Sequence, residues 1–326
     1  MLKKRYFIGV MIILLLSLFL AACGDNEESN AENQSSDENN GEQQENDAEE
    51  EENNGPELGK KDLTIPYVAW ARETVVSYLL GEVLEDIGYN VDVKQVETGP
   101  MWTSVANGSA DFTASAWLPE SQKAYWDKYK DQVKEVNQTL DEAPLALTVP
   151  TYMEDIHSVE DLKGNTELGE QLDWTITGID AGAGIMSLTD QALKDYKLDN
   201  WSVLASSEAA MITELKSAIE KEEPIVVTLW KPHWTFGVMD LKMLEDPEGT
   251  YGGDGGHISI VANNDMENYA PAAFKLITQY TETYDMIEKL MPKVFADDED
   301  PEKVAREFIE NNPDLIDEWT KGIPTE

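Results

Sequence analysis

Residues 63–70 read Leu-Thr-Ile-Pro-Tyr-Val-Ala-Trp, a short apolar run that predicts a buried strand with Trp70 just past its C-terminal end. Residues 114–119 (Ala-Ser-Ala-Trp-Leu-Pro) and 226–232 (Val-Val-Thr-Leu-Trp-Lys-Pro) repeat this arrangement and carry Trp117 and Trp230. Ligands of open α/β sheets bind in the crevice outside the carboxyl ends of the strands. Three tryptophans at such positions therefore predict an aromatic box at a ligand site.

Alternating strands and helices extend from the first of these stretches. The apolar pattern predicts strands at 63–69, 91–96 and 111–116, separated by helices at 74–87 and 99–107. This βαβαβ order is typical of a parallel sheet. A second unit of the same kind is expected further along, with strands at 145–150, 173–179, 201–205, 224–229 and 257–262.

Two α/β units followed by helices near 271–319 predict two lobes joined by crossing strands, which we place near Leu145–Pro150 and Ile258–Ala262. We expect residues 61–147 and 262–326 to form lobe 1, with the helical tail packed back on it. Residues 148–261 are expected to form lobe 2. A ligand cleft lies between such lobes, and they close around the ligand by a hinge motion.

The chain begins with a leader typical of exported proteins. Lys3-Lys4-Arg5 precedes an apolar run at 7–20, which is short for a membrane-spanning helix, and Leu20-Ala21-Ala22-Cys23 follows. This pattern predicts a lipoprotein signal peptide at residues 1–22 and a lipidated Cys23, which would anchor the protein on the extracellular face of the cell membrane. The alternative is a free thiol in a discarded leader. Because Cys23 is the only cysteine, we expect neither a disulfide nor a thiolate metal cluster.

A strongly acidic segment follows the leader. Residues 24–60 hold fourteen acidic residues and one lysine, with Leu58 as their only large aliphatic residue. Such a composition buries too little apolar surface to offset the entropy of ordering, so residues 23–60 are expected to form a disordered tether. The formal net charge of −41 falls to about −31 when the leader (+3) and this segment (−13) are set aside. We therefore expect no nucleic-acid partner, since phosphate binding needs clustered lysine and arginine.

The glycine-rich turn Gly182-Ala183-Gly184-Ile185 follows a predicted strand and opens a predicted helix. Backbone N–H groups at a helix start are unpaired and lie at the positive end of the helix dipole, so those of Gly184 and Ile185 could hold a carboxylate. The alternatives are a plain tight turn and a dinucleotide site, although the third glycine of the dinucleotide pattern is missing.

The tryptophans favour a particular ligand chemistry. A quaternary ammonium group cannot donate a hydrogen bond and is recognised by the faces of aromatic rings. A three-sided box of Trp70, Trp117 and Trp230 would fit such a group, while the Gly184 and Ile185 amides hold an attached carboxylate. The remaining tryptophans are interpreted as packing residues: Trp102, Trp126, Trp174, Trp201, Trp234 and Trp319.

Several motifs together resemble the glycine betaine-binding lipoproteins of osmoprotectant ABC importers. They are Val-Ala-Trp at 68–70, Glu-Thr-Gly-Pro-Met-Trp at 97–102, Ser-Ala-Trp-Leu-Pro at 115–119, Gly-Ile-Asp-Ala-Gly-Ala-Gly-Ile-Met at 178–186 and Trp-Lys-Pro-His-Trp at 230–234. The likeness runs from about residue 63 to residue 322. It implies a two-lobed, periplasmic-binding-protein-like α/β fold of type II. It also implies that glycine betaine or proline betaine is delivered to a membrane permease driven by a separate ATPase.

In that family the cage tryptophans match Trp70, Trp117 and Trp230, and the ligand carboxylate meets amides that match Gly184 and Ile185. Many members carry a histidine five residues after the Trp-Leu-Pro tryptophan, where this chain has Gln122. A glutamine amide donates a neutral hydrogen bond, which is about half as strong as one from imidazolium. We therefore predict that Gln122 contacts the carboxylate and that binding depends less on pH, between about 6 and 8, than in a histidine-bearing relative. The departure leaves carnitine, choline or a sulfonium analogue open as alternative ligands.

Two other classes of function have less support. A secreted enzyme would need catalytic groups, yet His157, His233 and His257 show no H-E-x-x-H spacing and no G-x-S-x-G motif is present. A binding protein for an amino acid or peptide would be expected to use a charged residue, and Arg72 is the only arginine near the predicted site. We expect a non-enzymatic binding protein with no cofactor and no metal.

Overall fold

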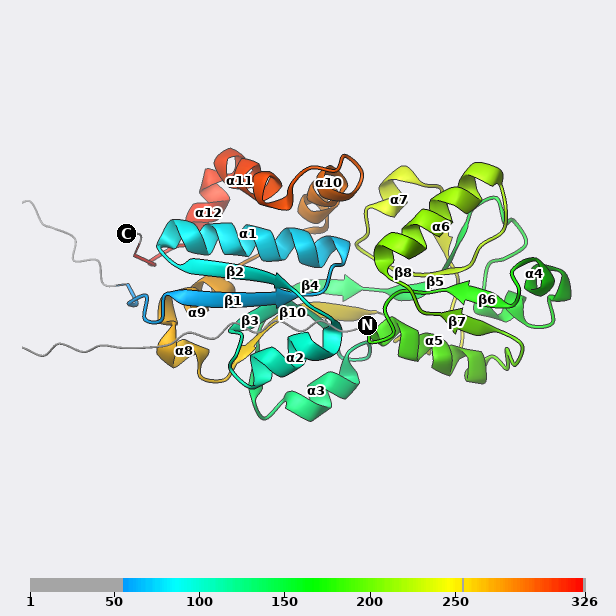
Figure 1. Cartoon of the computed structure of the whole chain (residues 1–326), viewed down its shortest axis with the longest axis horizontal. Helices are drawn as coiled ribbons and strands as arrows, with labels where there is room; N and C mark the ends of the chain where they lie inside the picture. The colour runs from blue at the N-terminus through cyan, green and yellow to red at the C-terminus, as the bar shows by residue number, and fades with distance from the viewer. Residues whose placement is uncertain (1–54, 254, 325–326) are drawn as a thin grey trace, which may run out of the picture. The chain divides into compact units, whose positions relative to one another are not determined.

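The computed structural model describes residues 55–253 and 255–324 (Figure 1). They belong to one compact unit, Glu52–Glu326. The predicted signal peptide, the predicted lipidation site at Cys23 and the predicted tether up to residue 54 lie outside the described residues. Three sheets organise the described part of the chain, and helices cover them.

The first lobe, defined as residues 62–143 and 256–324, begins with two parallel strands. Strand β1 (Asp62–Tyr67) pairs with strand β2 (Asn90–Gln95), and helix α1 (Ala71–Ile87) connects them. Gly88 ends this helix in the left-handed region at φ 115°, where its N–H group reaches the carbonyls of the last turn. These two strands form the parallel βαβ arrangement that the sequence predicts. The third strand predicted for this sheet, at 111–116, belongs instead to an antiparallel sheet.

An antiparallel sheet completes the first lobe. Its central strand β10 (Gly256–Asn263) pairs with β3 (Phe112–Leu118) on one side and with β4 (Val133–Ala143) on the other. By pairing with both, β10 satisfies backbone groups that would otherwise be left open between two strand edges. The strand thus belongs to the first lobe over its whole length, which differs from the predicted lobe 2 boundary at residue 261.

The second lobe, residues 145–243, is built on one mixed sheet with the order β7-β6-β8-β5-β9. Figure 1 shows helix α6 (Glu208–Lys221) above this sheet and helix α5 (Gly184–Asp195) below it. The strands are β5 (Leu145–Pro150), β6 (Thr175–Thr177), β7 (Ser202–Leu204), β8 (Val227–Trp230) and β9 (Leu241–Met243). The short helices of this lobe are η1 (Val159–Leu162), α4 (Thr166–Gln171) and α7 (Thr235–Val238).

The chain crosses between the lobes twice. It leaves the first lobe between Ala143, where β4 ends, and Leu145, where β5 begins. It returns ahead of β10, where a side chain at Gly256 would overlap the carbonyl oxygen of Leu118. The first crossing lies at the predicted strand, and the second lies before the predicted one.

The C-terminal helices pack back on the first lobe, as predicted. Helices α10 (Tyr284–Phe295) and α11 (Pro301–Asn311) lie against α1. Trp319 of helix α12 (Pro313–Trp319) is fully buried, with its ring centroid 4.7 Å from that of Tyr280. Two shorter helices, α8 (Met266–Tyr269) and α9 (Pro271–Gln279), link β10 to this group.

Several further features of the first lobe differ from the sequence prediction. Strand β4 and helix α3 (Lys123–Tyr129) are not predicted, and helix α2 (Thr98–Ala106) starts one residue early. Residues 55–60, which the sequence predicts to be part of the tether, contact the lobe. Lys60 Nζ lies 2.7 Å from Asp111 Oδ1, and the Leu58 carbonyl accepts a hydrogen bond from the Tyr89 hydroxyl (2.8 Å).

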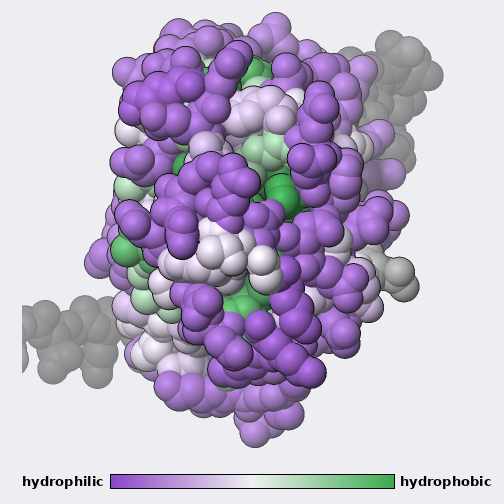
Figure 2. Space-filling view, turned by 90° about the vertical axis from the view of Figure 1, so that its right-hand side faces the viewer, coloured by the Kyte–Doolittle hydropathy of each residue, from purple (hydrophilic) through white to green (hydrophobic). Residues whose placement is uncertain are grey.

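Little large apolar surface is exposed. Among the described residues, the large hydrophobic side chains that are exposed are those of Tyr152, Leu204 and Val238. The face of the molecule in Figure 2 is mostly hydrophilic, in keeping with the acidic composition. No helix within residues 55–253 and 255–324 has both the length and the apolar character needed to cross a bilayer.

Candidate ligand-binding site

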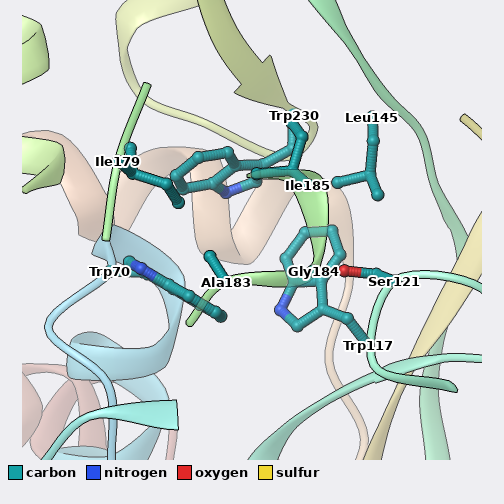
Figure 3. Close-up of a pocket in the computed structure, with 9 residues that line it drawn as sticks. All are labelled: Trp70, Trp117, Ser121, Leu145, Ile179, Ala183, Gly184, Ile185 and Trp230. Atoms are coloured by element: carbon teal, nitrogen blue, oxygen red, sulfur yellow. The ribbon is translucent and has the colours of Figure 1, made fainter. Parts of the chain in front are cut away.

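A cavity lies between the two lobes, and residues of both lobes line it (Figure 3). About 230 Å³ of space in and around it is free of protein atoms, part of it open to solvent. Aromatic and aliphatic side chains form most of its wall, so a bound group would be largely withdrawn from water. The lining residues are Trp70, Trp117, Ser121, Leu145, Ile179, Ala183, Gly184, Ile185 and Trp230.

The structure brings the three predicted box tryptophans together. Trp70 is the N-cap of α1, Trp117 lies near the end of β3, and Trp230 is the last residue of β8. The ring centroid of Trp230 is 6.0 Å from that of Trp70 and 6.3 Å from that of Trp117, with interplanar angles of 57° and 78°. Rings inclined in this way form adjoining walls of the cavity (Figure 3).

Two of the three indole N–H groups donate to carboxylates. Trp70 Nε1 is 3.1 Å from Asp180 Oδ2, and Trp117 Nε1 is 2.9 Å from Glu73 Oε1. Burial raises the pKa of both carboxyl groups above the ordinary values. The third ring, that of Trp230, lies edge-on to the His233 ring at 5.1 Å.

The start of helix α5 forms the opposite part of the cavity wall. Ala183 is its N-cap, and Gly184 and Ile185 are its first two residues. Backbone N–H groups in the first turn of a helix lack partners inside the helix and carry partial positive charge. The predicted anion site and the predicted box therefore face one cavity.

The structure does not bring Gln122 to this cavity. Its amide oxygen accepts a hydrogen bond from Trp102 Nε1 (2.7 Å), and its amide nitrogen donates to the Ser115 carbonyl (3.1 Å). Both ends of the side chain are thus engaged inside the first lobe, and the prediction that Gln122 contacts a ligand carboxylate does not fit this arrangement. Its neighbour Ser121 lines the cavity instead.

Sequence reasoning missed Ser121 and the two aliphatic residues of the wall, Leu145 and Ile179. Ser121 lies in the turn between β3 and α3, and a turn has no side-chain periodicity that would indicate which residue points to a ligand. Leu145 and Ile179 follow ordinary core patterns. The sequence signal that could have indicated them is their closeness to predicted site residues. Ile179, for example, lies in the motif at 178–186.

Hydrogen bonds join the two lobes around the cavity. The Trp70–Asp180 contact is one of them, because Trp70 belongs to the first lobe and Asp180 to the second. The N–H group of Ala71, the first residue of α1, donates to Glu208 Oε2 at the start of α6 (3.2 Å). The Tyr125 hydroxyl donates to the Gly182 carbonyl (3.1 Å).

Arg72 points away from the cavity and is fully buried. Its guanidinium donates to the Ala114 carbonyl, to Glu282 and to Thr139 Oγ1. These bonds use the charge within the first lobe. Arg72, the only arginine near the predicted site, is therefore not free to bind the charged end of an amino acid or peptide.

The histidines form structural contacts. His233 is buried between Glu208 (Nε2 to Oε1, 3.1 Å) and Thr235 (Nδ1 to Oγ1, 2.8 Å), while His257 contacts Glu135 (2.9 Å). Within the part of the chain that the structure describes, no group of three His, Cys, Asp or Glu side chains is placed to hold a metal ion.

Comparison with known proteins gives a consistent result. A model of the family described as the substrate-binding domain of ABC-type glycine betaine transport systems matches residues 61–311. The glycine betaine/carnitine transport binding protein GbuC of Listeria monocytogenes is 43% identical over 159 residues, which are 48% of this chain and 52% of that protein. The chain thus aligns with about half the length of this curated relative.

Two solved structures share the fold over most of their length. The glycine betaine/L-proline-binding protein ProX of Borrelia burgdorferi has a TM-score of 0.76 and 33% identity, and the match covers 79% of this chain and 96% of that one. Lactococcal OpuAC, solved in a closed-liganded conformation with glycine betaine, has a TM-score of 0.75 and 33% identity, with 80% and 100% covered. These matches confirm the predicted two-lobed α/β fold of type II binding proteins.

Proposed function

The chain belongs to the family of substrate-binding domains of ABC-type glycine betaine transport systems, and we propose that it captures glycine betaine or proline betaine outside the cell for import. One observation carries the proposal: three indole rings and the start of helix α5 face a single cavity. A betaine has a quaternary ammonium group and a carboxylate a short distance apart. One such molecule can therefore contact the rings and the helix start at the same time.

In this proposal the methylated ammonium group occupies the box of Trp70, Trp117 and Trp230. Each desolvated ring contributes up to about 2 kcal/mol to holding a cation. The ligand carboxylate accepts hydrogen bonds from the Gly184 and Ile185 amides, and the Ser121 hydroxyl is a third donor in the cavity wall. Charge at a helix start adds about 0.3–2 kcal/mol.

Binding and lobe closure are coupled in this arrangement. The box combines Trp70 and Trp117 of the first lobe with Trp230 of the second, and the carboxylate site lies on the second lobe. A ligand that fills both parts favours the arrangement with the lobes in contact, because only then do all its contacts form. The permease would then receive the ligand from a protein in this arrangement, with no catalytic step.

The predicted leader supports a proposal for where in the cell the protein is located. We propose that residues 1–22 are removed and that a lipid on Cys23 holds the protein on the outer face of the cell membrane. Residues 24–54 would then be the acidic tether. The permease and its ATPase are the proposed partners, and osmoprotection is the proposed physiological role.

Carnitine is the main alternative ligand, since the Listeria relative is named for glycine betaine and carnitine. Carnitine places a longer, hydroxylated chain between its two charged groups than glycine betaine does. The box and the helix start line the same small cavity, which favours the shorter ligand. Choline lacks the carboxylate and would leave the Gly184 and Ile185 amides without a partner.

Calorimetry of the mature protein with glycine betaine, proline betaine, carnitine and choline tests the proposal. We expect the two betaines to bind more tightly than carnitine and choline. The variant Trp230→Ala should reduce betaine affinity by about 30-fold or more, the loss of about 2 kcal/mol. Trp201→Phe, in the core of the second lobe, is the matched control and should bind normally. Near-normal affinity in Trp230→Ala would remove that residue from the box.

A further inference from the structure

Carboxylates lie at the N–H edges of two indole rings of the tryptophan box. Asp180 accepts the N–H hydrogen of Trp70, and Glu73 accepts that of Trp117. Neither carboxylate is among the residues that line the cavity. Each can therefore act on a bound group through its indole ring without lining the cavity.

The two carboxylates differ in their surroundings. Glu73 is fully buried, and its second oxygen, Oε2, has no hydrogen-bond partner among the described residues. Arg72 approaches Glu73 (3.5 Å) but makes its shorter contact with Glu282, so one guanidinium serves two carboxylates. Negative charge behind the Trp117 wall is therefore only partly neutralised by the protein.

Asp180 adds charge from the other lobe. It follows strand β6, and besides Trp70 it contacts the Thr98 hydroxyl (3.5 Å), so it faces two residues of the first lobe. Among the described residues, no lysine, arginine or histidine forms an ion pair with Asp180. Asp180 is therefore placed beside the Trp70 ring only when the two lobes are in contact.

An indole that donates to a carboxylate holds its π electrons in a more negative environment. The carboxylate at the ring edge also attracts, through space, a cation that lies on the ring face. Most of the side chains that line the cavity are apolar, so this attraction is weakly screened. Burial disfavours the ionised form of both carboxyls. A cation in the box offsets that cost.

We infer that Asp180 and Glu73 are specificity-determining residues that make the box select a permanent positive charge over an uncharged group of the same shape. This inference rests on the proposed function, because it assumes that the box holds a quaternary ammonium group. The ligand class that it defines is a methylated cation with or without an attached carboxylate, and it excludes the uncharged tert-butyl isosteres of such molecules.

The test uses Asp180→Asn and Glu73→Gln in the mature protein. An amide oxygen still accepts the indole hydrogen bond, so the substitutions remove charge while keeping the wall in place. Glycine betaine is compared with 3,3-dimethylbutanoate, which has the same shape and carboxylate but carbon in place of the ammonium nitrogen. The dissociation constant of betaine is measured by calorimetry. That of the isostere is measured by competition, with tryptophan fluorescence reporting how much betaine the isostere displaces.

We expect each variant to weaken betaine binding by about 10-fold or more and to leave the isostere affinity unchanged or improved. The ratio of the two dissociation constants should therefore shrink by about the same factor. Asp180→Glu, which keeps the charge, should recover betaine affinity relative to Asp180→Asn. Asp190→Asn, exposed on helix α5, controls for the loss of net charge and should bind like the wild type.

An unchanged ratio would overturn the inference, since a merely structural role weakens both ligands equally. Unchanged betaine affinity in both amide variants would overturn it as well. Failure of the proposed function gives a different result: the wild-type protein itself then fails to bind betaine.

Discussion

Gly184 and Ser121 belong to opposite lobes, and a side chain at Gly184 would overlap the backbone carbonyl of Ser121. The start of helix α5 can approach the first lobe this closely only because residue 184 has no Cβ atom. Close approach, and not an unusual backbone angle, is what requires glycine at this position. The same contact brings Ser121 to the helix start that we propose as the carboxylate site.

The variant Gly184→Ala should therefore bind betaine at least about 30-fold more weakly, because its methyl group holds the lobes apart and the ligand loses contacts on one of them. The protein should still fold, since the clash arises between lobes and not within either core. Calorimetry measures the affinity. Small-angle X-ray scattering with and without betaine reports whether the lobes still come together.

Gly182→Ala is the matched control, two residues away in the same turn. A Cβ atom at residue 182 would meet its nearest neighbour, the Tyr125 hydroxyl, at 3.5 Å, which is an ordinary contact. This variant should bind within a few-fold of the wild type. Equal losses in the two variants would show that the turn, and not the approach of Gly184 to Ser121, accounts for the effect.

Glu208 is predicted to support ligand binding without touching the ligand. Its carboxylate accepts the first N–H group of α1 from across the lobe boundary and is also held by His233. A negative charge at a helix start contributes about 0.3–2 kcal/mol. Glu208→Gln should therefore weaken betaine binding by roughly 2- to 30-fold. Glu214→Gln, exposed on the same helix, should have no effect, and a similar loss there would contradict the cross-lobe explanation.

The box could be predicted from the sequence because each tryptophan follows a short apolar strand, and such patterns are local. The carboxylates behind the box could not be predicted, because their partners lie far along the chain: Glu73 and Trp117 are 44 residues apart, and Trp70 and Asp180 are 110 apart. In a chain with 65 acidic residues, nothing local distinguishes these two.

The sequence also could not show that Ser121, and not the predicted Gln122, lines the cavity, and the cause is related. The two residues are neighbours in a turn, and their side chains take different directions because Gln122 is held by Trp102 and Ser115. The family resemblance supplied a position but not the direction of the side chain. The sequence also could not show which lobe contains β10. Its strand pattern would suit either lobe, and only its pairing with β3 and β4 identifies the sheet to which it belongs.

The pH dependence of binding should have a weak slope near neutrality and an acid limb. Burial raises the pKa of the Asp180 carboxyl above its ordinary value of 3.8. Protonation removes a negative charge from behind Trp70, so betaine affinity should fall as the pH is lowered through this raised pKa and stay constant above it. Calorimetry from about pH 4 to 8 measures the profile.

The contribution of Asp180 to stability without ligand has the opposite sign. A carboxyl whose pKa is raised on folding stabilises the fold below its ordinary pKa, and this stabilisation is lost as the pH rises through the raised value. In the binding profile, Asp180→Asn should reduce the loss of betaine affinity at acid pH. The loss that remains is expected to come from Glu73, because the pKa of its carboxyl is raised as well. An acid limb of the same size in Asp180→Asn would exclude Asp180 as a source.

Substitution of Trp319 should lower the stability of the fold without changing ligand affinity. This side chain is fully buried between Tyr280 and Phe308, and its Nε1 donates to the Thr281 hydroxyl (3.0 Å), all within the helical tail of the first lobe. Trp319→Ala leaves a large cavity there and should lower the free energy of unfolding by about 3–5 kcal/mol, measured by urea denaturation. Leu204→Ala, at a side chain that is 55% exposed, should change it by less than about 0.5 kcal/mol. Because the box draws no residue from the tail, the folded Trp319→Ala protein should bind betaine normally, and a parallel loss of affinity would show that the tail also controls the lobes.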